Sequence, residues 1–168
     1  MVRLVIIIFL VALHALLGTP QFFLGGSPYL LRAATYSFFH ASWWHLAVNC
    51  IAIWSIFRPI VFVEPRKYFR VFAVAYIIAI LVYPLSFKPV IGFSNVLYAI
   101  LGLNTPPLSN PWWRQASVVV FLAVTVALIC VPVFSTTTHI ASFLLGMGCA
   151  AIGRCYQDLL SDAGRYLR

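Results

Sequence analysis

Long apolar runs, separated by short segments that carry glycine, proline and charge, are the main pattern of this chain. Apolar runs of about 20 residues are long enough to cross a lipid bilayer as helices. The pattern predicts an all-α, polytopic membrane protein with six transmembrane helices. We expect one membrane-embedded domain over residues 1–168, with helices over residues 2–17, 42–57, 71–85, 94–103, 115–134 and 138–153.

The first apolar run, residues 2–17, has a second interpretation. A secretory signal peptide also begins with a basic residue ahead of an apolar segment, and Arg3 lies near the start of this run. The run lacks the small-residue cleavage pattern of such a signal. The sequence therefore favours a first transmembrane helix, with a cleaved signal as the alternative.

The fourth predicted helix, residues 94–103, is unusually short. Ten helical residues extend about 15 Å, whereas the hydrocarbon core of a bilayer is about 30 Å thick. Non-helical backbone at membrane depth is tolerated only inside protein or beside a water-filled cavity. The sequence therefore predicts a central fourth helix with a wet pocket at its start, within a six-helix bundle.

Composition supports a membrane protein over a soluble one. The chain is 63% hydrophobic and only 8% charged, whereas a soluble domain carries about 25% charged residues. Its net charge of +8 comes from basic residues that are isolated or gathered between residues 58 and 70. They do not form the basic stripe with interleaved aromatic residues that is typical of a nucleic-acid site. We expect a lipid bilayer as the surroundings and no binding of nucleic acid.

The distribution of Lys and Arg predicts the orientation, because cytoplasmic loops of membrane proteins collect these residues. With the amino terminus inside, only Arg32 and Lys88 of the 11 basic residues fall outside. Both termini are therefore expected in the cytoplasm, and the compact form suits a bacterial inner membrane. The second, fourth and sixth helices then all begin in the outer leaflet.

Four polar residues lie at the starts of these three helices. His45 and Asn49 share a face near the start of the second helix, Ser94 begins the fourth, and His139 lies at the start of the sixth. Polar groups within a membrane often mark a functional site, although some only hydrogen-bond neighbouring helices together. Their convergence on one end of three helices that run in the same direction favours a site.

A serine beside a histidine can act as an activated nucleophile, because the imidazole accepts the hydroxyl proton. The chain has only three acids, Glu64, Asp158 and Asp162, and all three are expected on the cytoplasmic side. We therefore expect a Ser94–His139 dyad without a carboxylate, with the imidazole packed on Tyr98.

Attack on a carbonyl creates a negatively charged oxygen that needs hydrogen-bond donors. The Asn49 amide, the His45 ring and the Ser94 backbone N–H are candidates for this role.

No metal or organic cofactor is expected. His40 and His45 are five residues apart, about 140° around a helix, and so do not share a metal-binding face. His40 is expected to hydrogen-bond within the first loop or the cavity. A haem bound by His14 and His139 is disfavoured, since His14 has no partner at helical spacing. The four cysteines lack C-x-x-C spacing.

Three patterns in this chain resemble those of the rhomboid intramembrane serine proteases, over roughly residues 32–146. The first is H-x-x-x-x-H-x-x-x-N at residues 40–49. The second is G-x-S-x at residues 92–95, with a tyrosine four residues after the serine. The third is a histidine that opens the last helix, followed by the small residues Ser142 and Gly146.

The resemblance implies a role for each matching residue. Ser94 is the expected nucleophile and His139 the general base and acid. His45 and Asn49 are the expected oxyanion donors, together with the Ser94 amide. The supporting residues implied in this way are Tyr98, Gly92, His40 and Arg32.

Three positions depart from the family's usual residues. Leu31 stands where the family has the tryptophan of a Trp-Arg pair. Asn95 replaces the glycine often found after the serine, and Ser142 replaces a glycine of the last helix. Serine is small, so we still expect close packing of the fourth and sixth helices.

The predicted function is a serine endopeptidase that cleaves membrane proteins in or near their transmembrane segments and releases a domain on the outer side. A helical substrate must unwind locally, which favours small or helix-breaking residues near the cleaved bond. A catalytically inactive relative that binds membrane clients is the alternative. A transporter would need broken helices in both halves of the chain. The sequence leaves the substrate and the oligomeric state open.

Overall fold

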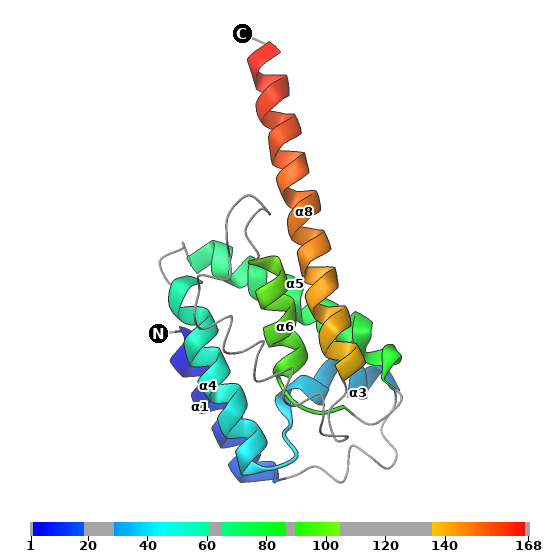
Figure 1. The fold of residues 1–168 in the computed structure, drawn as a ribbon. Coiled ribbons are helices and arrows are strands. Elements are labelled where there is room, and N and C mark those ends of the chain that lie inside the picture. The colour runs from blue at the N-terminus through cyan, green and yellow to red at the C-terminus, as the bar shows by residue number, and fades with distance from the viewer. Residues whose placement is uncertain (1, 19–28, 61–64, 87–89, 105–135, 167–168) are drawn as a thin grey trace.

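The computed structural model describes residues 2–18, 29–60, 65–86, 90–104 and 136–166. These ranges form helices and their connections and contain no strand, which confirms the all-α prediction for this part of the chain (Figure 1). The predicted helix over residues 115–134 lies outside the described residues. The α-helices are α1 (Val2–Leu17), α3 (Tyr29–Thr35), α4 (Trp43–Ile60), α5 (Pro65–Val82), α6 (Ser94–Leu103) and α8 (Thr136–Tyr166), and two 3-10 turns are η1 (Tyr36–Phe38) and η2 (Tyr83–Leu85).

Helix α6 is the central element of the described part. It has 10 residues, as the sequence predicted, and contacts α4, α5, α8 and η1 (Figure 1). Its residues 95–102 are all buried. Apolar side chains from α4 and α5, including Ile53, Ile78 and Val82, pack with Leu97 and Ile100 of α6 in the core. The core therefore surrounds the helix that begins with Ser94.

Helices α6 and α8 meet through their backbones. A Cβ atom added to Gly146 would lie 2.5 Å from the Ala99 carbonyl oxygen and 3.0 Å from the Leu103 nitrogen. A Cβ added to Gly102 would collide with the Phe143 carbonyl oxygen. Glycine is required at both positions because no side chain fits between the two helices at these points. This close approach brings the starts of α6 and α8 together.

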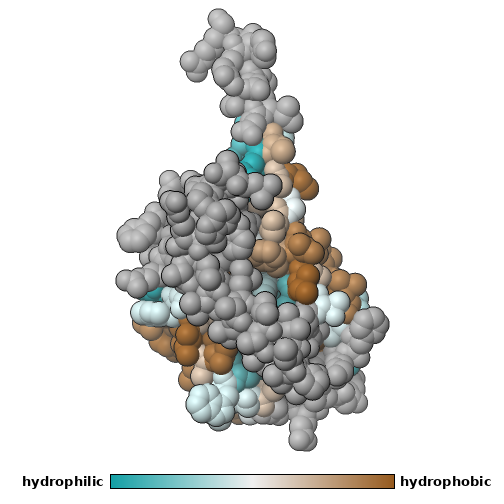
Figure 2. Space-filling model, in the orientation of Figure 1, coloured by the Kyte–Doolittle hydropathy of each residue, from teal (hydrophilic) through white to brown (hydrophobic). Residues whose placement is uncertain are grey.

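The outer faces of several helices are apolar. Leu16, Ile51, Leu81 and Ile152 are each more than half exposed. Figure 2 shows hydrophobic residues along the part of α8 that accompanies the bundle. Within the described ranges, no helix meets both the length and the hydropathy expected of a membrane-crossing segment.

Several helix boundaries differ from the sequence-based expectation. Helix α4 continues through Arg58 and Pro59 to Ile60, and α5 begins at Pro65, ahead of the charged residues that were expected in a loop. Proline is favoured at the first position of a helix, and Lys and Arg are good helix formers. Helix α8 continues past Gly153 to Tyr166, because a polar segment can extend a helix that an apolar segment begins. The hydropathy pattern predicted the apolar parts of these helices but not the polar residues that extend them.

The first connection, residues 19–41 in the prediction, contains structure that the apolar pattern did not reveal. Helix α3 and turn η1 lie within it. Two tyrosine hydroxyls attach this segment to α5. Tyr36 of η1 donates to the Ala79 carbonyl oxygen at 2.8 Å, and Tyr76 of α5 donates to the Ala34 carbonyl oxygen. The connection is therefore held against the same helix that packs on α6.

Candidate active site

The start of α4 places His45 and Asn49 on one face. Ser42 precedes the helix, and its hydroxyl oxygen accepts a hydrogen bond from the His45 backbone N–H at 3.2 Å. Such a cap satisfies a donor that the first turn of a helix leaves without a partner. One turn later, the Asn49 side-chain nitrogen donates to the His45 carbonyl oxygen at 3.1 Å. An amide nitrogen carries a second hydrogen, so Asn49 can donate one more bond.

Gly92 connects these two residues to the start of α6. Its φ is +120°, a backbone conformation that favours glycine. A Cβ at this position would lie 2.7 Å from His45 Nε2 and 3.6 Å from Asn49 Nδ2. The chain just before Ser94 therefore runs against the polar edges of His45 and Asn49.

The tautomer of His45 follows from its hydrogen bond. The Ala41 backbone N–H donates to His45 Nδ1 at 3.5 Å. In a neutral ring the proton is then on Nε2, the atom that lies close to Gly92. His45 and Asn49 consequently present N–H donors to the segment that leads into α6.

Ser94 and His139 meet at the adjoining starts of α6 and α8. The Ser94 Oγ lies 2.8 Å from His139 Nε2, within hydrogen-bond distance. The His139 ring also stacks on Tyr98, with ring centroids 4.7 Å apart and an interplanar angle of 12°. His139 is only 8% exposed and Tyr98 only 5%. The imidazole is thus held between the serine hydroxyl and an aromatic face.

The pair has no carboxylate partner from α8. Asp158 lies about five helical turns beyond His139, roughly 28 Å along the helix axis, and Asp162 lies farther still. The remaining acid, Glu64, is outside the described residues. Within the ranges that the structure describes, no three His, Cys, Asp or Glu residues are arranged to hold a metal ion.

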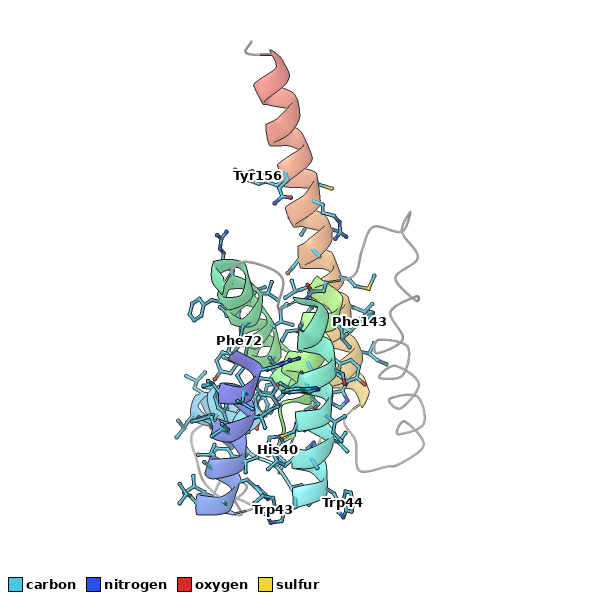
Figure 3. All side chains as sticks on the ribbon, turned by 90° about the vertical axis from the view of Figure 1, so that its left-hand side faces the viewer. His40, Trp43, Trp44, Phe72, Phe143 and Tyr156 are labelled. Carbon is cyan, nitrogen blue, oxygen red and sulfur yellow. The ribbon has the colours of Figure 1, made fainter. Side chains whose placement is uncertain are left out.

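His40 lies beside the site rather than in it. The centroid of its ring lies 6.4 Å from that of His14 and 5.2 Å from that of His45, and Figure 3 shows His40 between α1 and α4. A backbone hydrogen bond with Phe38 of η1 acts on the His40 ring, in line with the expectation that His40 hydrogen-bonds within the first loop. Burial lowers the pKa of His40 to about 3, and the nearby His45 and His14 rings add to this effect. The His40 ring is therefore neutral at physiological pH.

His14 and Tyr36 make contacts that sequence spacing did not identify. His14 of α1 is 5% exposed and packs edge-on against Trp43, with centroids 4.6 Å apart. Tyr36 of η1 accepts a hydrogen bond from the Asn95 side chain. Both contacts join segments that are far apart in the sequence, so only the structure reveals them.

Arg32 lies in α3, and its buried Nε has no hydrogen-bond partner among the described residues.

Comparison with protein families identifies the chain. A family model described as the Rhomboid domain matches residues 27–155, which is more than half of the sequence. No curated protein and no solved structure matches it. The matched range contains the four residues at the starts of α4, α6 and α8. The chain belongs to the rhomboid family.

Proposed function

We propose that this protein is an intramembrane serine endopeptidase that uses Ser94 and His139 as a catalytic dyad. The observation that carries the proposal is the 2.8 Å distance between Ser94 Oγ and His139 Nε2. Family membership supports it, because rhomboid proteins are typically intramembrane serine proteases. The stacking of His139 on Tyr98 adds support, since an oriented base is needed to activate a hydroxyl.

In this mechanism, His139 Nε2 accepts the Ser94 proton while Ser94 Oγ attacks the carbonyl carbon of the scissile bond. The carbonyl oxygen becomes an oxyanion, which the Asn49 amide, His45 Nε2–H and the Ser94 backbone N–H stabilise. His139 then donates its proton to the leaving amine, and an acyl-enzyme remains on Ser94. Water, deprotonated by His139, hydrolyses this ester and restores the serine. The dyad needs no metal and no organic cofactor.

The proposed setting is a lipid bilayer. Rhomboid family members are integral membrane proteins, and we assign this chain six spans around a short central helix, with a wet pocket at the start of that helix. The bias of Lys and Arg supports cytoplasmic termini, and we place the protein in a bacterial inner membrane.

The proposed substrates are membrane proteins with a transmembrane segment that unwinds near the site. A peptide bond inside a helix is shielded by its own hydrogen bonds, so cleavage favours small or helix-breaking residues around it. The catalytic end of the bundle is assigned to the outer leaflet. Cleavage there releases a domain on the outer side.

The test uses the purified chain in detergent, a fluorophosphonate probe and a model single-span substrate. The unmodified protein is expected to bind the probe covalently and to cleave the substrate. Ser94→Ala abolishes both reactions, and His139→Ala reduces both by several orders of magnitude. Ser55→Ala is the matched control, because Ser55 lies on α4 outside the site. An unmodified protein that binds the substrate without labelling or cleavage would instead be an inactive relative that holds membrane clients.

A further inference from the structure

Asn95, the residue after Ser94, is joined to the first connection. Its side chain is fully buried, and its Nδ2 donates to the hydroxyl oxygen of Tyr36 at 2.9 Å. The two residues lie 59 positions apart in the sequence. A glycine after the serine, as in the family pattern described above, has no side chain with which to make this bond. The hydrogen bond is therefore a feature of this chain's own residues.

Tyr36 contacts the chain on both sides of Ser94. Its hydroxyl accepts from Asn95 and donates to the Ala79 carbonyl oxygen of α5 at 2.8 Å. Its backbone carbonyl accepts from the Gly92 N–H at 3.0 Å. Burial raises the pKa of Tyr36 to about 12, so the hydroxyl remains protonated and keeps its donor at physiological pH. One residue of η1 thus ties the start of α6 to α5.

The start of α6 has little local support of its own. Phe93 occupies the cap position, and no side chain there forms a capping hydrogen bond. A helix that lacks such a bond frays more easily at its first turn. The hydrogen bonds that Gly92 and Asn95 donate to Tyr36 therefore hold the turn that carries the Ser94 hydroxyl. Small displacements of a reacting group reduce reaction rates strongly, so this support has a kinetic consequence.

We propose that Asn95 and Tyr36 are positioning residues that act as a pair: their hydrogen bond sets the first turn of α6 and so holds Ser94 Oγ against His139. This inference rests on the function proposed above. Neither residue touches the substrate in this account, and both act through Ser94. Their loss should slow the chemical step and leave substrate binding nearly unchanged.

A double-mutant cycle tests the pair. The variants are Asn95→Ala, Tyr36→Phe and the double variant, measured for kcat and KM on the model substrate and for the rate of fluorophosphonate labelling. Each single change is expected to lower kcat and the labelling rate about 10-fold, equivalent to about 1.4 kcal/mol. KM should change less than about 2-fold. The double variant should be hardly slower than the worse single variant, because both changes remove the same bond.

Tyr76→Phe is the matched control. Tyr76 also attaches the first connection to α5, through the Ala34 carbonyl oxygen, but the structure records no bond between it and Asn95. This variant should lower the unfolding temperature and leave kcat and the labelling rate within about 2-fold of the unmodified protein. A loss of kcat equal to that of Tyr36→Phe would show a general effect of loosening the connection, and the pairing inference would be wrong.

Two other outcomes separate this inference from the proposed function. If the unmodified protein reacts with the probe and Asn95→Ala reacts equally fast, the positioning role is wrong and the protease proposal stands. If the fold losses in kcat of the two single variants multiply in the double variant, the two residues act independently and the pairing inference is also wrong. If the unmodified protein neither labels nor cleaves, the proposed function fails and takes this inference with it.

Discussion

Helices α6 and α8 are joined in a different way from α1 and α4. The first pair meets through backbone atoms at Gly102 and Gly146, where no side chain fits. The second pair is connected by long side chains: the Arg3 guanidinium lies 3.8 Å from the centroid of the Trp54 ring and donates to the Trp54 carbonyl oxygen. At its two glycines the first interface has no room for a side chain, whereas the second interface depends on long side chains.

The difference shows which pair of helices must keep a fixed relative position. Packed backbones cannot move aside, so one added methyl group displaces a whole helix. Flexible side chains at the other interface can adopt new rotamers and absorb a substitution. Ser94 and His139 lie on the rigid pair, and their 2.8 Å contact depends on it. We therefore expect the two interfaces to respond very differently to small changes.

The largest effect is expected from Gly146→Ala. The new Cβ would lie 2.5 Å from the Ala99 carbonyl oxygen, so α6 and α8 must separate. Overpacking of this kind costs about 1–3 kcal/mol, and the separation should also abolish cleavage. Thermal unfolding in detergent and cleavage of the model substrate measure the two consequences.

Gly148→Ala is the control for this prediction. A Cβ at Gly148 meets no atom of the described residues within 4 Å, so Gly148→Ala should stabilise α8 through the higher helix propensity of alanine. Equal unfolding temperatures for the two variants would contradict the close packing of α6 and α8.

A smaller but still large effect is expected from Gly92→Ala. The change forces a non-glycine residue to a φ of +120° and brings a Cβ to 2.7 Å from His45 Nε2. Displacement of an oxyanion donor typically costs about 100-fold to 1,000-fold in kcat. The measurement is kcat for the model substrate.

Gly18→Ala separates strain from site geometry. Gly18 also has a positive φ, of 64°, but no atom of the described residues lies within 4 Å of a Cβ added there. The Gly18→Ala variant should be less stable than the unmodified protein and should cleave the model substrate at the same rate. If both glycine variants cleave at the rate of the unmodified protein, the His45 ring is not a donor in the reaction.

Tyr98→Leu tests the aromatic face behind His139 and should have an intermediate effect. The stacked ring, at 4.7 Å, restricts the imidazole to one orientation, and its removal should lower kcat by about 10-fold. Tyr98→Phe keeps the ring and should lose clearly less activity. The rate of fluorophosphonate labelling compares the two variants, and an equal loss in both would assign the effect to the hydroxyl.

The smallest effect is expected at the side-chain interface. Arg3→Gln removes the cation–π contact with Trp54, which is worth about 0.5–1 kcal/mol at an exposed site. The unfolding temperature should fall slightly while the cleavage rate stays the same. A loss of activity comparable to that of Gly146→Ala would remove the distinction between the two interfaces.

Sequence patterns identified the helices that are apolar throughout. Helices α1 and α6 have the predicted bounds, because each is an apolar run ended by glycine, proline or asparagine. Helix α8 is longer than expected, since helix formation does not require an apolar face along its whole length. Helix α3 was missed because it is short and lies in a connection with mixed composition.

The candidate site was predictable where spacing along a helix was enough. The i, i+4 pairs His45–Asn49 and Ser94–Tyr98 depend only on helix geometry. The bond between Asn95 and Tyr36 depends on how η1 packs on α6, and no local pattern contains that information. Contacts between distant segments are decided by tertiary packing, which is why this part of the site required the structure.

The order of the dyad along the chain has a consequence for biosynthesis. Ser94 and both candidate oxyanion side chains precede His139, which arrives only with α8. In the proposed mechanism, a nascent chain that ends before α8 holds the nucleophile without its base and so cannot hydrolyse its neighbours in the membrane. Under the proposed mechanism, proteolytic activity therefore requires that α8 has been synthesised and has docked on α6.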